Sequence, residues 1–260
     1  MRFKTHSFDT RYMTKYGLFG YPLGHSFSRG FFTDKFAKEK IDAEYLNFEI
    51  PSIDEYIATL DANPELKGHN VTIPYKQQVI PFLDELSREA KAIGAVNVVR
   101  VGEKNGKRYL KGYNSDVIGF VDSLRPLLTP IHTAALILGT GGASKAVKYG
   151  LEKKLGMETL YVSRTPKPGM ITYEQVTLAI LRKYQVIVNC SPCGMYPHVD
   201  ECPDIPYEAL SSDNILFDLV YNPLETLFMK KGAENGAVVK NGLEMLHLQA
   251  IASWEFWNEK

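Results

Sequence analysis

Three cysteines and one histidine fall close together in the chain and could bind a metal ion. Cys190, Cys193, His198 and Cys202 have the spacing C-x2-C-x4-H-x3-C, one residue short of the C-x2-C-x4-H-x4-C zinc knuckle. Thiolate and imidazole groups are the ligands that a structural zinc ion prefers. Taken alone, the motif favours a zinc site that binds single-stranded nucleic acid.

The composition argues against that interpretation. The chain has 260 residues with 30 Lys and Arg against 30 Asp and Glu, so its formal net charge is zero. A nucleic-acid-binding protein usually carries an excess of basic residues that neutralise phosphates. With 45% hydrophobic residues the chain can build a large core and does not need a metal to fold. We therefore expect no metal and no nucleic-acid partner.

The cysteines and the hydropathy pattern also indicate a compartment. Three cysteines in one short segment are not the layout of a disulfide scaffold, which favours a reducing environment. The first twenty residues are polar and charged, and no apolar run approaches the length that spans a membrane. We expect a cytoplasmic protein with no membrane partner.

Strand-like and helix-like stretches alternate along the chain. Runs rich in Val, Ile, Leu, Tyr and Phe predict strands at 15–20, 43–50, 68–73, 95–101, 133–139, 159–164, 185–190 and 214–221. Amphipathic patterns predict helices at 28–40, 52–62, 74–86, 144–156 and 172–184. An Asn-Gly pair at 105–106 predicts a local hairpin. This alternation predicts an α/β fold with mostly parallel sheets covered by helices.

A glycine-rich turn follows the apolar run at 133–139 and precedes a predicted helix. In that context the turn predicts a dinucleotide site, with the pyrophosphate on the helix N-terminus. Gly139 permits the tight turn, and the next glycines let the backbone approach phosphate. A purely structural glycine turn is the alternative. The predicted cofactor-binding residues here are Gly139, Gly141, Gly142, Ala143 and Ser144.

The end of the next predicted strand indicates which dinucleotide binds. An NAD site places an acidic residue there, about 20 residues after the glycines. This chain has Ser163, Arg164 and Thr165 instead. A guanidinium can pair with a 2′-phosphate and the hydroxyls can add hydrogen bonds, so we predict NADP(H). An exposed arginine at a strand end is the alternative.

The cysteine segment follows another predicted strand, at 185–190. We therefore expect it to form a loop at the carboxyl edge of the sheet, where open α/β folds bind ligands.

Seven motifs follow one another along nearly the whole chain: GYPLGHSFS, HNVTIPYK, IGAVN, YNSD, GTGGAS, SRT and NGLEMLHLQA. Taken in this order, they resemble the shikimate dehydrogenase family. The resemblance implies a two-domain enzyme that reduces 3-dehydroshikimate to shikimate with NADPH in the shikimate pathway. It implies a substrate domain at 1–116, completed by a C-terminal helix at 243–260, and a Rossmann-type NADP-binding domain at 117–242.

By this resemblance Ser26 and Ser28 bind the substrate carboxylate. Hydroxyls and backbone N–H groups in a glycine-rich turn before a helix suit a carboxylate, although plain N-capping is the alternative.

The chain departs from the family pattern at two places. The family usually has proline after the second serine, whereas this chain has Arg29. A second departure is in the cofactor loop, where Pro168 stands at the place of a second arginine, with Lys167 beside it.

The resemblance also assigns Thr72, Asn97, Tyr221 and Gln249 to substrate binding and Gly242 to the nicotinamide pocket. Amide and hydroxyl groups can recognise ring hydroxyls directionally. Ordinary turn, cap or core-packing roles are the alternatives, and Asn70 is a weaker candidate of the same kind. Because Gln249 is far from the others in sequence, the last helix is expected to return to the first domain.

Lys76 and Asp116 are the predicted catalytic residues. By resemblance the pair binds the hydroxyl at the reacting carbon, with Lys76 donating the proton as hydride arrives from NADPH. A helix cap for Asp116 and a solvated side chain for Lys76 are the alternatives. A non-catalytic ligand sensor would be expected to lack one of these groups, and both are present. A quinate/shikimate dehydrogenase of broader specificity stays open, as does the choice between monomer and homodimer.

Overall fold

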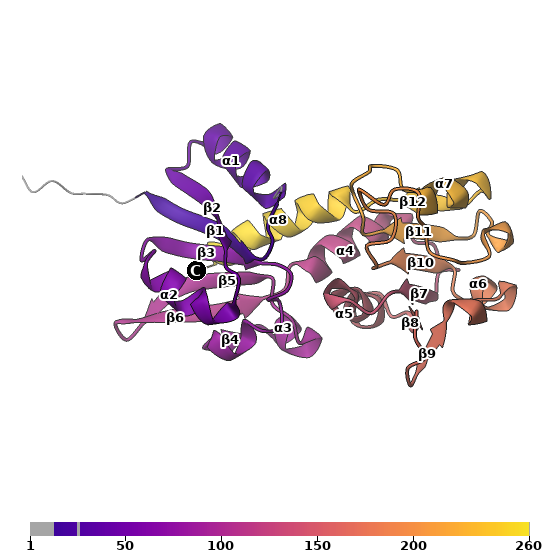
Figure 1. The fold of residues 1–260 in the computed structure, drawn as a ribbon, viewed down its shortest axis with the longest axis horizontal. Coiled ribbons are helices and arrows are strands. Elements are labelled where there is room, and N and C mark those ends of the chain that lie inside the picture. The colour runs from indigo at the N-terminus through magenta and orange to yellow at the C-terminus, as the bar shows by residue number, and fades with distance from the viewer. Residues whose placement is uncertain (1–12, 25–26, 260) are drawn as a thin grey trace, which may run out of the picture.

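The computed structural model describes residues 13–24 and 27–259. Two sheets of six strands each lie at opposite ends of an elongated molecule, with helices α4 and α8 passing between them (Figure 1). Within the described residues no helix is both long and apolar enough to cross a membrane.

The first sheet combines parallel and antiparallel strands. Its order is β2-β1-β3-β5-β6-β4, in which β2, β1 and β3 are parallel and β5 and β6 form an antiparallel hairpin. Asn105 and Gly106 both have positive φ at the hairpin turn, which confirms the hairpin predicted from this pair. The strands are β1 Thr14–Gly20, β2 Ala43–Glu49, β3 Leu66–Val71, β4 Glu85–Leu86, β5 Val98–Lys104 and β6 Lys107–Tyr113.

The strand directions of this sheet bring distant segments to one edge. The carboxyl ends of β1 and β3 lie at this edge, and so does the amino end of β5, because β5 runs antiparallel to β3. The carboxyl end of β6 returns to the same edge. Residues that follow β1, β3 and β6 therefore meet those that precede β5.

Helices pack on both faces of the first sheet. One face packs against α1 (Phe27–Glu39) and α8 (Leu243–Trp257), through Phe32, Phe36 and Trp257. The other face packs against α2 (Tyr56–Asp61) and α3 (Arg88–Ile93). A Cβ atom added at Gly68 would lie 2.2 Å from Trp257 Cδ1, so the close approach of α8 requires glycine in β3. The predicted return of the C-terminal helix to the first domain is thus confirmed.

The second sheet is parallel throughout. Its order β12-β11-β10-β7-β8-β9 is the doubly wound 3-2-1-4-5-6 order read from the other side, which confirms the predicted Rossmann-type fold. The strands are β7 Ala134–Leu138, β8 Glu158–Ser163, β9 Met170–Thr172, β10 Val186–Asn189, β11 Ile215–Asp218 and β12 Val238–Lys240.

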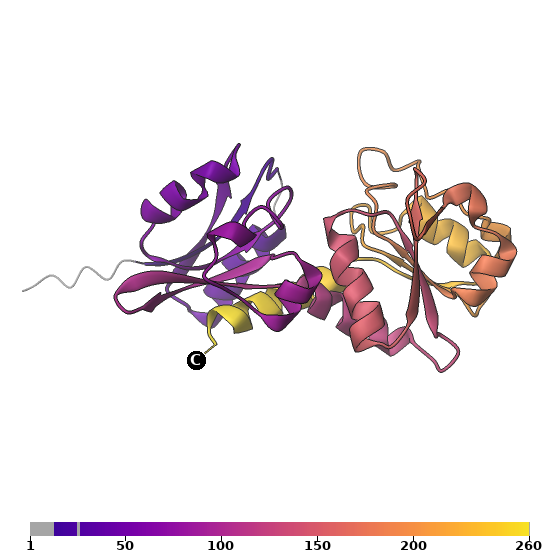
Figure 2. The same ribbon diagram turned by 90° about the horizontal axis from the view of Figure 1, so that it is seen from below.

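Alternate residues of the second sheet form two separate cores. Ala135, Ile137 and Phe217 pack with α4 (Asp116–Leu124) and α5 (Gly142–Tyr149), while Leu136 and Leu216 pack with α6 (Leu178–Lys183) and α7 (Leu227–Glu234). The view from below shows helices on both faces of this sheet (Figure 2). The predicted domain boundary at 116/117 falls directly after the first residue of α4, and the boundary at 242/243 falls directly before α8. The division into these two domains stays a prediction.

One predicted helix is wrong and another is divided. Residues 74–79 form turns and only Ile80–Phe82 form a 3-10 helix, so no α-helix covers 74–86. Pro81 lacks an N–H and its ring would clash with the carbonyl of Gln77 in an α-helix. The predicted helix at 172–184 consists of a 3-10 turn at Tyr173–Gln175 followed by α6.

Candidate active site

Lys76 and Asp116 meet at the edge of the first sheet where β3 and β6 end. Lys76 lies in the turns after β3, and Asp116 is the first residue of α4. Lys76 Nζ donates to Asp116 Oδ2 over 2.6 Å, and the side chains are 18% and 5% exposed. The N-terminus of α4 favours the carboxylate, because the helix dipole is positive there. The pair therefore offers a proton donor held by a fixed anion.

Asn97 fixes the other oxygen of Asp116. Its Nδ2 donates to Asp116 Oδ1 over 2.9 Å and to Ser115 Oγ over 3.0 Å, while its Oδ1 accepts from Ser115 N over 2.7 Å. Gln249 Oε1 lies 3.5 Å from the same Nδ2. The amide of Asn97 is thus held between β5 and α4, and it orients the carboxylate.

Asn70 is committed to contacts within the protein. Its Nδ2 donates to Ser253 Oγ over 2.9 Å and to Asn97 O over 3.2 Å, and its Oδ1 accepts from Tyr45 Oη over 2.8 Å. Both amide donors are used, so Asn70 ties β2, β5 and α8 together. Tyr45 and Ser253 were not predicted from the sequence, because isolated hydroxyl residues carry no spacing signal.

The remaining predicted substrate residues surround the same edge. Thr72 follows β3 and is half-buried, and its backbone N–H donates to Phe19 O over 2.9 Å. Ser28 lies in the first turn of α1 and hydrogen-bonds Tyr45, whose pKa is raised by burial and lowered in part by this bond. Ser26 lies outside the described residues. Thr72, Asn97, Gln249 and Ser28 therefore belong to one region of the structure.

Contacts across the space between the two sheets bring their loops together. Tyr221, after β11, lies with its ring centroid 6.4 Å from that of Phe27 in α1. The Phe27 ring in turn lies 5.0 Å from the His247 ring in α8. Lys145 of α5 donates to Gln77 Oε1 over 3.0 Å, beside Lys76. The edge of the first sheet that holds Lys76 and Asp116 therefore faces the edge of the second sheet where β11 ends.

The glycine-rich turn joins β7 to α5 as predicted. Gly139 has a φ of +96°, and α5 begins at Gly142, with open space where its Cβ would stand. The first N–H groups of such a helix lack partners within it, which suits a pyrophosphate. Ser144 is 1% exposed and its Oγ donates to Gly141 O over 2.7 Å, so its hydroxyl shapes the turn. Ala143 is half-buried beside it.

Basic and hydroxyl groups gather at the end of β8. Arg164 and Thr165 are exposed, and Ser163 Oγ accepts from Thr165 N over 3.3 Å. Lys167 Nζ donates to Thr140 Oγ1 in the glycine-rich turn over 3.2 Å. Lys167 thus reaches the phosphate-binding turn from the loop that carries Arg164. These residues fit a dinucleotide with an extra phosphate on its ribose.

Gly242 precedes α8 and packs against the end of β11. A Cβ atom there would lie 2.3 Å from Leu219 O, and Gly242 N donates to Val220 O over 3.2 Å. The missing side chain makes room for this backbone, and its role toward the nicotinamide stays a prediction.

The cysteine segment is a loop at the end of β10. Burial raises the pKa of Cys190 and raises that of Cys193 to about 11, while His198 is exposed with Nδ1 3.7 Å from Glu201 Oε1. The part of the chain that the structure describes holds no cluster of three or more potential metal ligands. The expectation of a metal-free protein is not tested further and stays a prediction.

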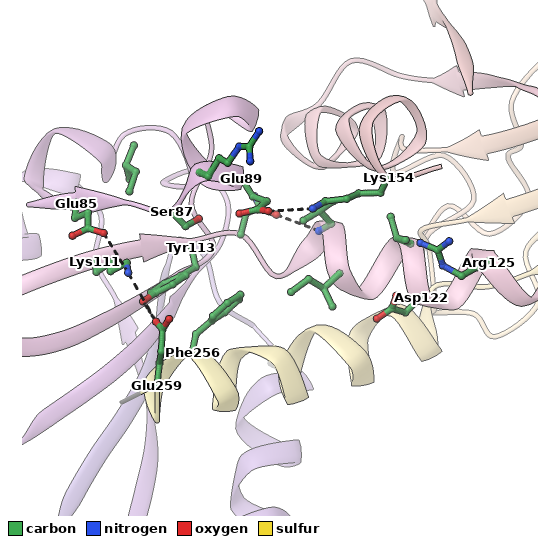
Figure 3. Close-up of a pocket in the computed structure, with 16 residues that line it drawn as sticks. Glu85, Ser87, Glu89, Lys111, Tyr113, Asp122, Arg125, Lys154, Phe256 and Glu259 are labelled. Carbon is green, nitrogen blue, oxygen red and sulfur yellow. Dashed lines mark hydrogen bonds and ion pairs between the residues drawn. The ribbon is translucent and has the colours of Figure 1, made fainter. Parts of the chain in front are cut away.

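A cavity of about 590 Å³ lies between the first sheet, α4 and the end of α8 (Figure 3). No predicted substrate or cofactor residue lines it. Two ion pairs lie on its wall: Glu89 with Lys154 at 3.1 Å and Glu85 with Lys111 at 3.2 Å. Because the lining contains none of the predicted site residues, we place the chemistry at the Lys76–Asp116 edge.

A parallel doubly wound sheet with this glycine turn, joined to a second α/β unit that holds a lysine–aspartate pair, defines a two-domain, NADP-dependent oxidoreductase. Residues 18–99 match the family model described as the shikimate dehydrogenase substrate binding domain. The chain is 38% identical over 263 residues to the shikimate dehydrogenase (NADP(+)) of Halothermothrix orenii, covering 93% of this chain and 89% of that protein. It is 37% identical to that of Aquifex aeolicus, with 94% and 90% covered.

Solved structures agree with the sequence relatives. A shikimate 5-dehydrogenase of Thermus thermophilus in complex with NADP(H) and shikimate superposes with a TM-score of 0.82 at 29% identity, covering 95% of this chain and 94% of that one. The chain therefore belongs to the shikimate dehydrogenase family.

Proposed function

We propose that the protein reduces 3-dehydroshikimate to shikimate with NADPH. The observation that carries the proposal is the 2.6 Å contact between Lys76 Nζ and Asp116 Oδ2, at an edge that faces the dinucleotide turn. Family membership supports the substrate and the cofactor. NADPH supplies the hydride that the carbonyl carbon of the substrate receives.

Lys76 acts as the general acid in this proposal. Its ammonium donates a proton to the carbonyl oxygen as the carbon is reduced, and the lysine then regains a proton from solvent. Asp116 holds the ammonium in place, and Asn97 holds Asp116. In the reverse direction Lys76 accepts the proton from the alcohol.

The substrate contacts extend from this pair. Ser26 and Ser28 would bind the carboxylate, and Thr72, Asn97, Tyr221 and Gln249 would contact the ring hydroxyls. This assignment is supported by the family resemblance and by the way the strands end at one edge. Only a polar ligand suits such a lining, because each buried donor or acceptor needs a partner.

The cofactor would lie on the second sheet. The glycines at 139, 141 and 142 with Ala143 and Ser144 form the pyrophosphate turn, and Ser163, Arg164 and Thr165 lie where the 2′-phosphate would bind. We add Lys167 to this set, because its contact with Thr140 gives the site a second cation. Gly242 would border the nicotinamide.

Four further expectations stay predictions: a cytoplasmic location, a monomer or homodimer, no nucleic-acid partner and no membrane partner.

Replacing the proposed acid tests the mechanism. Lys76→Ala should lower turnover of 3-dehydroshikimate by about 10²–10⁴-fold, the usual contribution of a general acid. NADPH binding, measured by fluorescence titration, should change little. Lys67→Ala, an exposed lysine of β3, is the matched control and should keep full turnover. Near-normal turnover of Lys76→Ala would reject the mechanism even though the family assignment stands.

A further inference from the structure

Asp218 is a fully buried carboxylate that the proposed mechanism does not use. It is the last residue of β11 and has an exposed fraction of 0%. Its Oδ1 accepts from Asn189 Nδ2 and from Val220 N, each over 3.0 Å, and its Oδ2 accepts from Thr226 Oγ1 over 2.6 Å. All of these donors are neutral, so among the described residues the carboxylate has hydrogen bonds but no counter-ion.

Within residues 13–24 and 27–259, the titratable groups that interact with Asp218 add no positive charge. Those that interact with it electrostatically are Cys190 and Cys193 in the loop after β10 and Tyr207 in the 3-10 turn Tyr207–Ala209. The pKa of each of these groups is raised, chiefly by burial, so each is neutral near neutral pH. Burial raises the pKa of Asp218 itself to about 6, against the opposing effect of its hydrogen bonds.

The first connection from Asp218 runs to the dinucleotide turn. Asn189, held by Asp218, accepts through Oδ1 from Ser191 Oγ over 2.6 Å and from Ser191 N over 3.0 Å. Ser191 packs against Gly139, where an added Cβ would lie 3.2 Å from Ser191 Cβ. β7 and β10 are the neighbours at which the strand order reverses, the place where such sheets bind ligands.

The second connection runs to the loop that carries Tyr221. Val220 N donates to Asp218, and Val220 O accepts from Gly242 N at the start of α8. Thr226, bonded to the other carboxylate oxygen, accepts from Met229 N and caps α7. One carboxylate therefore fixes the segments that follow β10 and β11 on the nicotinamide side of the cleft.

We infer that the ionised Asp218 carboxylate is a positioning residue that holds loops 190–194 and 219–223 in place for the nicotinamide of NADPH, so that hydride transfer depends on it. Protonation gives Asp218 an O–H donor and removes acceptor capacity, so Thr226, Asn189 and Val220 can no longer all donate to it as before. Turnover is therefore expected to fall as the pH drops through about 6. The inference rests on the proposed dehydrogenase activity.

The test is Asp218→Asn, which keeps the shape and removes the charge. We expect kcat with NADPH and 3-dehydroshikimate to fall roughly 10- to 100-fold, the scale of a small misplacement of the reactants. The Michaelis constant for 3-dehydroshikimate should stay unchanged. The acid limb of the wild-type kcat profile near pH 6 should disappear.

Thermal melting separates positioning from packing. Because the folded pKa of Asp218 is raised above its unfolded value, the stability that this group contributes is full at low pH and is lost as the pH rises through about 6. Asp218→Asn should therefore melt at the same temperature as the wild type or higher above that pH. Lower turnover without lower stability supports positioning.

Substitution of Thr226, which donates a hydrogen bond to Asp218, tests the role of Asp218 a second time. Thr226→Val removes the hydroxyl donor to Asp218 and should move the acid limb to higher pH, whereas Thr226→Ser should restore the wild-type profile. If kcat falls at the same acidic pH in the wild type, in Asp218→Asn and in Thr226→Val, the inference is overturned, whatever the change in the size of kcat. A wild-type protein that turns over no 3-dehydroshikimate would instead reject the proposed function.

Discussion

Asp116 and Asp218 are both buried carboxylates at the end of a secondary-structure element, yet they are stabilised in different ways. Asp116 begins α4 and faces the ammonium of Lys76 at 2.6 Å. Asp218 ends β11 and, in the part of the chain that the structure describes, accepts hydrogen bonds only from the neutral donors of Asn189, Val220 and Thr226. Burying a charge is costly unless it is paired, so the two sites differ in what ionisation costs.

The difference fits the two tasks that we propose for the two edges. A lysine–aspartate pair can hold a proton donor beside a substrate, because the carboxylate accepts a hydrogen bond from the ammonium. The Asp218 carboxylate instead accepts hydrogen bonds from the backbone and side chains of several loops and so holds them in fixed directions. Because it is buried, its pKa is raised. The proposed substrate edge is thus built around a charge pair and the proposed nicotinamide edge around a hydrogen-bonded anion.

The two asparagines that hold these carboxylates allow the sharpest comparison. Asn97→Ala leaves Asp116 Oδ1 and Ser115 N without the hydrogen bonds that Asn97 makes to them, and each unpaired buried group costs about 1–3 kcal/mol. The substitution should therefore lower kcat/KM for 3-dehydroshikimate roughly 10- to 100-fold. Asn189→Ala should instead raise the Michaelis constant for NADPH and leave that for 3-dehydroshikimate unchanged. Steady-state kinetics with each substrate varied in turn measures both. The same pattern in the two variants would contradict the separation of tasks.

Removing a cation from the cofactor side sharpens the contrast further. Arg164→Ala should raise the Michaelis constant for NADPH about tenfold, because a hydrogen bond to a charged group contributes about 1.5–3 kcal/mol and Lys167 remains nearby. The constant for 3-dehydroshikimate should not change. Arg182→Ala, an exposed arginine of α6, serves as the control. An unaltered NADPH constant in Arg164→Ala would remove this residue from the site.

The smallest effect is expected at the ion pair between α3 and the segment that follows α5, which joins the two halves of the molecule. Lys154 and Glu89 are 41% and 37% exposed, and such a pair contributes about 0–1 kcal/mol. Lys154→Ala should lower the free energy of unfolding by no more than this in urea titration, and less at high salt. Lys153→Ala, which removes an exposed neighbouring lysine, is the control. A larger loss would show that the pair, rather than α4 and α8, holds the domains together.

Local sequence signals predicted the elements that depend on backbone chemistry. The Asn-Gly hairpin, the glycine turn between β7 and α5 and the apolar strands of the second sheet all follow from short-range preferences. The helix predicted at 74–86 failed because Pro81 outweighs the amphipathic pattern around it. A signal for Asp218 was present, since an acidic residue inside the apolar run 214–221 indicates a buried carboxylate.

Local patterns and ordered motifs were enough to predict the α/β class and the NADP-type turn. They also singled out Lys76 and Asp116, whose catalytic roles stay a prediction. The contacts among Asn70, Tyr45 and Ser253 could be found only in the folded chain, because Asn70 and Ser253 are 183 residues apart and meet through the return of α8. The same is true of Asp218, which has no counter-ion among the described residues. Hydrogen-bond direction and charge compensation depend on which side chains packing brings together, and spacing along the chain does not encode them.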